Sequence, residues 1–252
     1  MKFVGADGCA AGWVAVALSG PGFAEVQMFE GFSDLWRAHE DAQTLLVDMP
    51  IGLPGAASPV READVCARAM LGPRRSSVFS PPLREVLDCP DHASANAASR
   101  KLCGKGLSRQ AWNIAEKIRQ VDEVVRQAPA IPGVVREAHP EVCFAALAGI
   151  PMNHYKKTLL GALDRLKVLQ KYYESAEVLL RNTMAEHPRT AVAEDDVLDA
   201  LVLAVSAREA GPNLLCLPKT MPMDMLPVDG CGLPMAIWYH APQTTTFKPA
   251  KG

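Results

Sequence analysis

The spacing of apolar and polar residues predicts a strand-rich beginning of the chain. The apolar runs 2–7 and 13–18 are separated by the Gly-x-x-x-Gly segment 8–12, which predicts a hairpin. The alternating residues 25–29 predict a third antiparallel strand. Residues 34–41 then predict a short helix with an acid in its first turn.

The next apolar run, residues 44–47, predicts a strand in the interior of a sheet. It is apolar on both faces and follows a crossover helix, and such strands usually pair in parallel with an earlier neighbour. A long excursion from about 54 to 132 predicts a mostly helical insertion, with helices over 61–71 and 108–127. The chain then returns to a short strand over 134–137.

The following segments are predicted to be helical. Proline in a first turn predicts a helix over 142–147. Two amphipathic helices follow over 156–169 and 172–186, and Lys156 and Lys157 are typical of a solvated helix end.

The end of the chain completes the predicted α/β fold. Residues 214–217 and 235–239 predict an edge strand. The patterns together predict a single domain over 1–240 that contains the helical insertion at about 54–132, followed by a flexible tail over 241–252.

Acidic residues end three of the predicted strands, at Asp7, Asp48 and Glu137. If the strands of Asp7 and Asp48 are parallel neighbours, both acids leave the sheet at the same edge, about 4.8 Å apart. Two carboxylates at that separation repel each other unless a cation lies between them. The pattern predicts a metal site, and a plain Asx-type turn at Asp7 is the alternative.

A further group of acids begins the predicted helix over 194–205. Helix capping explains Asp195 and Asp196, but Asp199 lies inside an otherwise apolar segment. Asp196 and Asp199 share one face of the helix, and negative charges on an apolar helix need cations or a solvated cleft.

Composition narrows the class of protein. The 252 residues are 49% hydrophobic and 21% charged, as in soluble globular proteins, and no apolar run approaches the roughly 18 residues of a membrane helix. The seven cysteines are scattered without a C-x-x-C pair, which predicts neither a disulfide framework nor a zinc site. We expect a cytoplasmic protein that does not bind membranes.

Positive charge is concentrated in one part of the chain. Residues 61–119 carry a balance of +5, against -7 for the remainder. Within this part, Arg74, Arg75, Ser76 and Ser77 are candidates to hold phosphate oxygens, and a solvated loop is the alternative.

Several of these segments together resemble a known family. The blocks that carry the resemblance are residues 4–9 with 12–13, 48–53, 75–79, 112–114 with 117–118, 137–141 and 195–201. In this order they resemble the predicted RNase H-like nuclease family related to RuvC and YqgF, also known as domain of unknown function 429. The resemblance implies an RNase H-like mixed sheet with three antiparallel strands first, later strands parallel to the opening one, and a late helix carrying the last acids.

The resemblance also implies which acids of this chain match the acidic residues of the family. Asp7 matches the first-strand acid, and Asp48 matches the fourth-strand acid, for which resolvases commonly have Glu. Asp196 and Asp199 match the late-helix Asp-x-x-Asp-Ala-Leu motif. Glu137 and Glu141, with His139 between them, match a motif of the narrower family whose roles are not established.

The sequence therefore predicts a metal-dependent nuclease. We expect Asp7, Asp48 and Asp199, with Asp196 or Glu137, to hold one or two Mg²⁺ or Mn²⁺ ions, which need hard oxygen ligands. The substrate is nucleic acid, and DNA or RNA, and monomer or homodimer, stay open. An actin-like or sugar-kinase-type phosphotransferase or ATPase is one alternative, although residues 7–12 lack the Ser/Thr of that phosphate loop. A non-catalytic binding module is the other.

Overall fold

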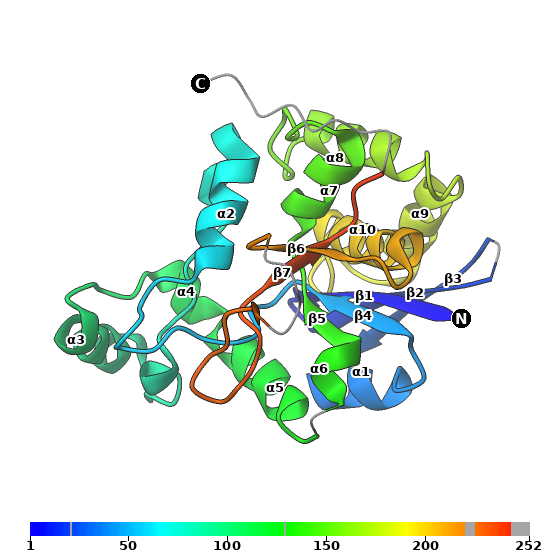
Figure 1. Cartoon of the computed structure of the whole chain (residues 1–252). Helices are drawn as coiled ribbons and strands as arrows, with labels where there is room; N and C mark the ends of the chain where they lie inside the picture. Colours follow the sequence, from blue (N-terminus) through cyan, green and yellow to red (C-terminus); the bar gives the residue numbers. More distant parts are fainter. Residues whose placement is uncertain (21, 129, 220–224, 243–252) are drawn as a thin grey trace.

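A mixed sheet of five strands, with helices on both faces, forms the centre of the part of the chain that the computed structural model describes (Figure 1). This part comprises residues 1–20, 22–128, 130–219 and 225–242, so the predicted tail over 241–252 lies almost wholly outside the described residues. The strands are β1 (Lys2–Cys9), β2 (Gly12–Ser19), β3 (Phe23–Phe29), β4 (Thr44–Val47) and β5 (Val135–Glu137). Their order in the sheet is β3-β2-β1-β4-β5.

The strand directions bring the first two candidate acids to one edge. Strands β1, β2 and β3 are antiparallel, whereas β4 pairs in parallel with β1 and β5 pairs in parallel with β4. Ala6 lies opposite Val47, and the backbone N–H of Asp48 donates to the Ala6 carbonyl oxygen at 2.9 Å. The prediction that the strands of Asp7 and Asp48 are parallel neighbours is confirmed.

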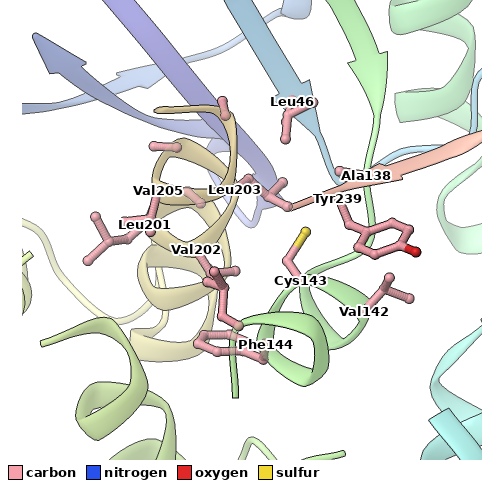
Figure 2. Close-up of a cluster of buried hydrophobic side chains, with 14 of the residues drawn as sticks. Leu46, Ala138, Val142, Cys143, Phe144, Leu201, Val202, Leu203, Val205 and Tyr239 are labelled. Carbon is pink, nitrogen blue, oxygen red and sulfur yellow. The ribbon is translucent and has the colours of Figure 1, made fainter. Parts of the chain in front are cut away.

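On one side of the sheet in Figure 1 lie α7 (Pro140–Ala148), α8 (Leu159–Leu169), α9 (Ala176–Glu186) and α10 (Glu194–Ala210), and α10 packs directly on the strands. Helix α10 packs directly on β1, because Gly5 has no side chain. A Cβ atom at Gly5 would lie 2.1 Å from the carbonyl oxygen of Ala200 and 2.3 Å from the backbone nitrogen of Ala204. Figure 2 shows the apolar cluster to which Phe144 of α7 and Val202 of α10 belong.

A second apolar cluster lies on the opposite side of the sheet, beneath α1 (Phe32–Ala38), α5 (Ala115–Val125) and α6 (Ile131–Val134). The rings of Trp13 and Phe32 have their centroids 5.0 Å apart, and the indole N–H of Trp13 donates to Gln120 at 2.8 Å. All four residues of β4 are buried, as its apolar pattern predicts for an interior strand.

The segment between β4 and α5 contains α2 (Glu62–Leu71), η1 (Gly72–Ser77), η2 (Arg84–Val86), α3 (His92–Cys103) and α4 (Arg109–Asn113). The single helix predicted over 108–127 is instead interrupted at Ile114. The reason is that Ala111 of α4 packs in a small separate cluster with Leu83, whereas α5 packs against the sheet. Helix α3 has no counterpart in the sequence prediction, although its Asp91 cap accepts a hydrogen bond from Ser94 N–H.

The last two strands, β6 (Leu215–Leu217) and β7 (Ile237–Tyr239), form a two-stranded antiparallel sheet of their own. The two predicted strands are present, but they pair with each other instead of adding an edge strand to the main sheet. Residues Ile237 and Tyr239 are buried in the cluster between α7 and α10, and a bridge from Trp238 to Ala138 connects β7 to the end of β5. No helix among the described residues is both long enough and apolar enough to cross a membrane.

Candidate metal site

Three aspartates converge at the edge where β1 and β4 end. One carboxylate oxygen from each of Asp7, Asp48 and Asp199 lies within 4.8 Å of the other two, close enough for all three to bind one metal ion. We call these residues the aspartate cluster. Asp7 and Asp48 come from neighbouring strands, and α10 brings Asp199 to them through its close packing on β1 at Gly5.

Asp7 and Asp199 are buried and Asp48 is half-buried, and the three charges repel one another. Burial raises the pKa of Asp7 well above its usual value, and the charges of Asp48 and Asp199 raise it further. Burial also raises the pKa of Asp48. Burial raises the pKa of Asp199 to about 7, although Lys156 acts in the opposite direction. Ionising all three carboxyls at neutral pH therefore requires added positive charge.

Two buried carboxylate oxygens near the cluster have no hydrogen-bond partner among the described residues. They are Oδ1 of Asp199 and Oε2 of Glu141, and both residues line the same cavity of about 570 Å³, together with Asp7 and Asp48. The other oxygen of Glu141 accepts a hydrogen bond from the buried Arg165. The charge of Glu141 raises the pKa of both Asp48 and Asp199.

Lys156 lies against the aspartate cluster, so the prediction of a solvated helix end is wrong for this residue. Its Nζ lies 2.6 Å from Oδ2 of Asp199 and 3.4 Å from Oδ2 of Asp195. Lys157, by contrast, is exposed. Nothing in the local sequence distinguishes the two lysines, because the partners of Lys156 lie about 40 residues away on α10.

The structure does not bring Asp196 into the group of three. Its Oδ2 accepts a hydrogen bond from the backbone N–H of Ala193 at 2.9 Å, which caps the N-terminus of α10. Asp196 therefore has the capping role that the sequence suggests. Of the two aspartates in the Asp-x-x-Asp motif, only Asp199 belongs to the aspartate cluster.

Glu137 also lies apart from the group of three, in a buried ion-pair network. Its Oε2 accepts a hydrogen bond from Ile51 N–H at 2.7 Å, and both of its oxygens accept from Arg61. Arg61 in turn pairs with Asp64 at 3.0 Å and donates to the Ile51 carbonyl oxygen at 3.1 Å. These contacts tie Glu137 to the segment that follows Asp48.

The predicted phosphate-binding residues lie on η1, at the rim of the cavity. Arg74, Ser76 and Ser77 line the cavity, whereas the exposed Arg75 is not among its lining residues. Arg74 is partly committed, because its Nε donates to the Met152 carbonyl oxygen at 2.9 Å and its Nη2 donates to the next carbonyl oxygen.

Other polar and aromatic side chains complete the cavity wall. They include Lys117 of α5, which donates to the Gly12 carbonyl oxygen, and His139, whose Nε2 lies 3.2 Å from the Ser77 carbonyl oxygen. Phe79 and Tyr155 also line it and are 44% and 56% exposed. The cavity is thus lined by acidic, cationic and aromatic side chains.

A comparison with known proteins gives a family and no function. The sequence profile of a family described as protein of unknown function (DUF429) matches residues 5–222, and the chain therefore belongs to this family. No curated protein and no solved structure matches the chain.

Proposed function

We propose that this member of the family is a metal-dependent nuclease that hydrolyses phosphodiester bonds in nucleic acid. The observation that carries the proposal is the convergence of Asp7, Asp48 and Asp199 from three separate elements in one cavity. Three neighbouring carboxylates, two of them buried, are unfavourable in their ionised form unless a cation binds. The oxygens of a carboxylate cluster suit Mg²⁺ or Mn²⁺.

The sheet supports an RNase H-like fold for this function. Three antiparallel strands come first, β4 and β5 continue in parallel with β1, and a late helix carries the last acid, as the resemblance implies. The first-strand and fourth-strand acids occupy the edge where the late-helix acid arrives.

The residues of the cavity suggest how the reaction proceeds. Asp7, Asp48 and Asp199 would hold the metal ion, which when bound polarises the phosphoryl group and favours ionisation of water. The free Oε2 of Glu141 accepts the proton of the attacking water, and Arg165 holds the glutamate in place through the other oxygen. Water attacks the phosphorus, the bond from phosphorus to the leaving sugar oxygen breaks, and that oxygen takes a proton from solvent and leaves as a hydroxyl group.

The cavity walls suit a nucleic-acid strand. Arg74 and Lys117 lie where they can face phosphate oxygens, and the Ser76 hydroxyl adds a neutral donor. The exposed rings of Phe79 and Tyr155 offer surfaces on which unpaired bases can stack.

A cleavage panel tests the proposal. End-labelled single strands, duplexes, RNA–DNA hybrids and branched junctions are incubated with protein in Mg²⁺, in Mn²⁺ and in EDTA. We expect divalent-dependent cleavage of at least one substrate, abolished in Asp7→Asn and in Asp48→Asn and retained in Asp88→Asn, which neutralises an exposed acid outside the cavity. Equal cleavage by all four proteins, or no cleavage by the folded wild type, would contradict the proposal.

A further inference from the structure

Lys156 is held against the aspartate cluster by an anchored segment between α7 and α8. The backbone before it is fixed by Arg74, which donates to the carbonyl oxygens of Met152 and Asn153. The backbone after it is fixed by Thr158, whose side chain caps α8 by accepting a hydrogen bond from Gly161 N–H at 3.1 Å. The ammonium is thus positioned by the fold, and the side chain is 27% exposed.

The ammonium of Lys156 offsets part of the negative charge of the aspartate cluster. Asp7, Asp48 and Asp199 together carry -3 when ionised, and Lys156, whose ammonium also lies 3.4 Å from Asp195, offsets part of this sum. Glu141 does not change the sum, because Arg165 pairs with it. Without Lys156 the cluster would have one more uncompensated negative charge with which to attract a second Mg²⁺ or Mn²⁺ ion.

The carboxylate oxygens that are free to bind a metal favour a single divalent ion. Oδ2 of Asp199 is occupied by Lys156, whereas Oδ1 is buried and has no partner among the described residues. Oδ1 of Asp7 accepts a hydrogen bond from Gly8 N–H at 2.7 Å. A pair of metal ions commonly shares a carboxylate through its two oxygens, and here the ammonium occupies the Asp199 oxygen that a second ion would need.

We propose that Lys156 is a built-in cation that limits the aspartate cluster to one divalent ion. Its ammonium takes the place beside Asp199 that a second ion would fill. In the reaction, a role that rests on the proposed nuclease function, it supplies the second positive charge next to the phosphoryl group.

The test compares metal stoichiometry in matched lysine variants. Mn²⁺ binding is measured by isothermal titration calorimetry and by electron paramagnetic resonance in the full-length wild type, Lys156→Met and Lys157→Met. We expect one ion per chain in the wild type and in Lys157→Met, and two ions per chain in Lys156→Met. Lys156→Arg, which keeps the charge, should bind one ion. Two ions in the wild type, or one ion in a folded Lys156→Met, would overturn the proposal.

A folding control and a rate measurement separate the proposal from misfolding of the variants and from the proposed nuclease function. Lys156→Gln is the second neutral variant, and circular dichroism establishes that each protein is folded. If a substrate is cleaved, the rate should rise with the first power of Mn²⁺ concentration in the wild type and with the second power in Lys156→Met. One ion in the wild type and two in Lys156→Met, without cleavage of any substrate, would support the built-in cation while contradicting the nuclease function. Cleavage by a wild type that binds two ions would support the nuclease function and contradict the built-in cation.

Discussion

Neutralising Asp7 should make the metal-free protein more stable while abolishing its stabilisation by metal. Asp7→Asn removes one of three carboxylates that lie within 4.8 Å of one another. The new amide keeps an oxygen that can accept the hydrogen bond from Gly8 N–H, and the partner of Lys156 is untouched. The change therefore removes repulsion with little loss of bonding.

The size of the effect follows from the geometry. Two unit charges 4.8 Å apart repel by about 3.5 kcal/mol at an effective dielectric constant of about 20, and Asp7 faces two such charges. The Lys156 ammonium offsets part of this repulsion, and the raised pKa of Asp7 means that partial protonation relieves more of it. We expect a net gain of about 1–3 kcal/mol, or about 3–10 °C in Tm for a domain of this size.

Thermal unfolding followed by circular dichroism measures both effects. Wild type, Asp7→Asn and the exposed-acid control Asp88→Asn are melted at pH 7.5 in EDTA and in 10 mM Mg²⁺. We expect Asp7→Asn to melt above the wild type in EDTA and to gain nothing from Mg²⁺, whereas the control behaves as the wild type. An Asp7→Asn variant that melts below the wild type in EDTA and is still stabilised by Mg²⁺ would refute the reasoning.

Three further predictions follow from the same structure. Because the pKa of Asp199 is about 7 in the fold against 3.8 in the unfolded chain, folding favours its protonated form. The contribution of Asp199 to stability in EDTA should therefore be fully present below about pH 4 and be lost as the pH rises to 7, so that urea unfolding shows the wild type losing more stability over this range than Asp199→Asn, with Mg²⁺ protection of the wild type growing over the same range. Gly5→Ala should displace α10, cost about 3 kcal/mol or more and weaken Mn²⁺ binding in calorimetry, whereas Gly133→Ala, with open space around it, should do neither. Arg61→Ala should lower the free energy of urea unfolding by about 3–5 kcal/mol by leaving two buried carboxylates unpaired, whereas Arg37→Ala, from an exposed pair, should leave it unchanged within error.

The main sheet could be predicted from the sequence because its signals are local. The apolar run 44–47 is too short to be a helix and follows a crossover, so its place beside β1 follows from general rules of topology. Strand β7 has no such rule. Its apolar residues predict a strand, but they do not show which strand it pairs with, and their burial between α7 and α10 depends on the packing of the whole chain.

In the candidate site, too, some residues could be predicted from the local sequence and others could not. Asp7, Asp48 and Asp199 could be identified because each interrupts or ends an apolar run, where an unpaired acid needs an explanation. Glu137 carries the same signal, but its side chain meets Arg61, which no local pattern pairs with it. Lys156 was predicted to be solvated, because charged residues at a helix end usually are and its partners are distant in sequence.

Whether the aspartate cluster binds a metal ion can be seen directly by anomalous diffraction from crystals of the full-length protein grown with Mn²⁺. We expect one manganese peak in the cavity, bonded to carboxylate oxygens of Asp7, Asp48 and Asp199, with the Lys156 ammonium still against Asp199. Crystals in saturating Mn²⁺ that show no peak at the aspartate cluster would contradict this expectation.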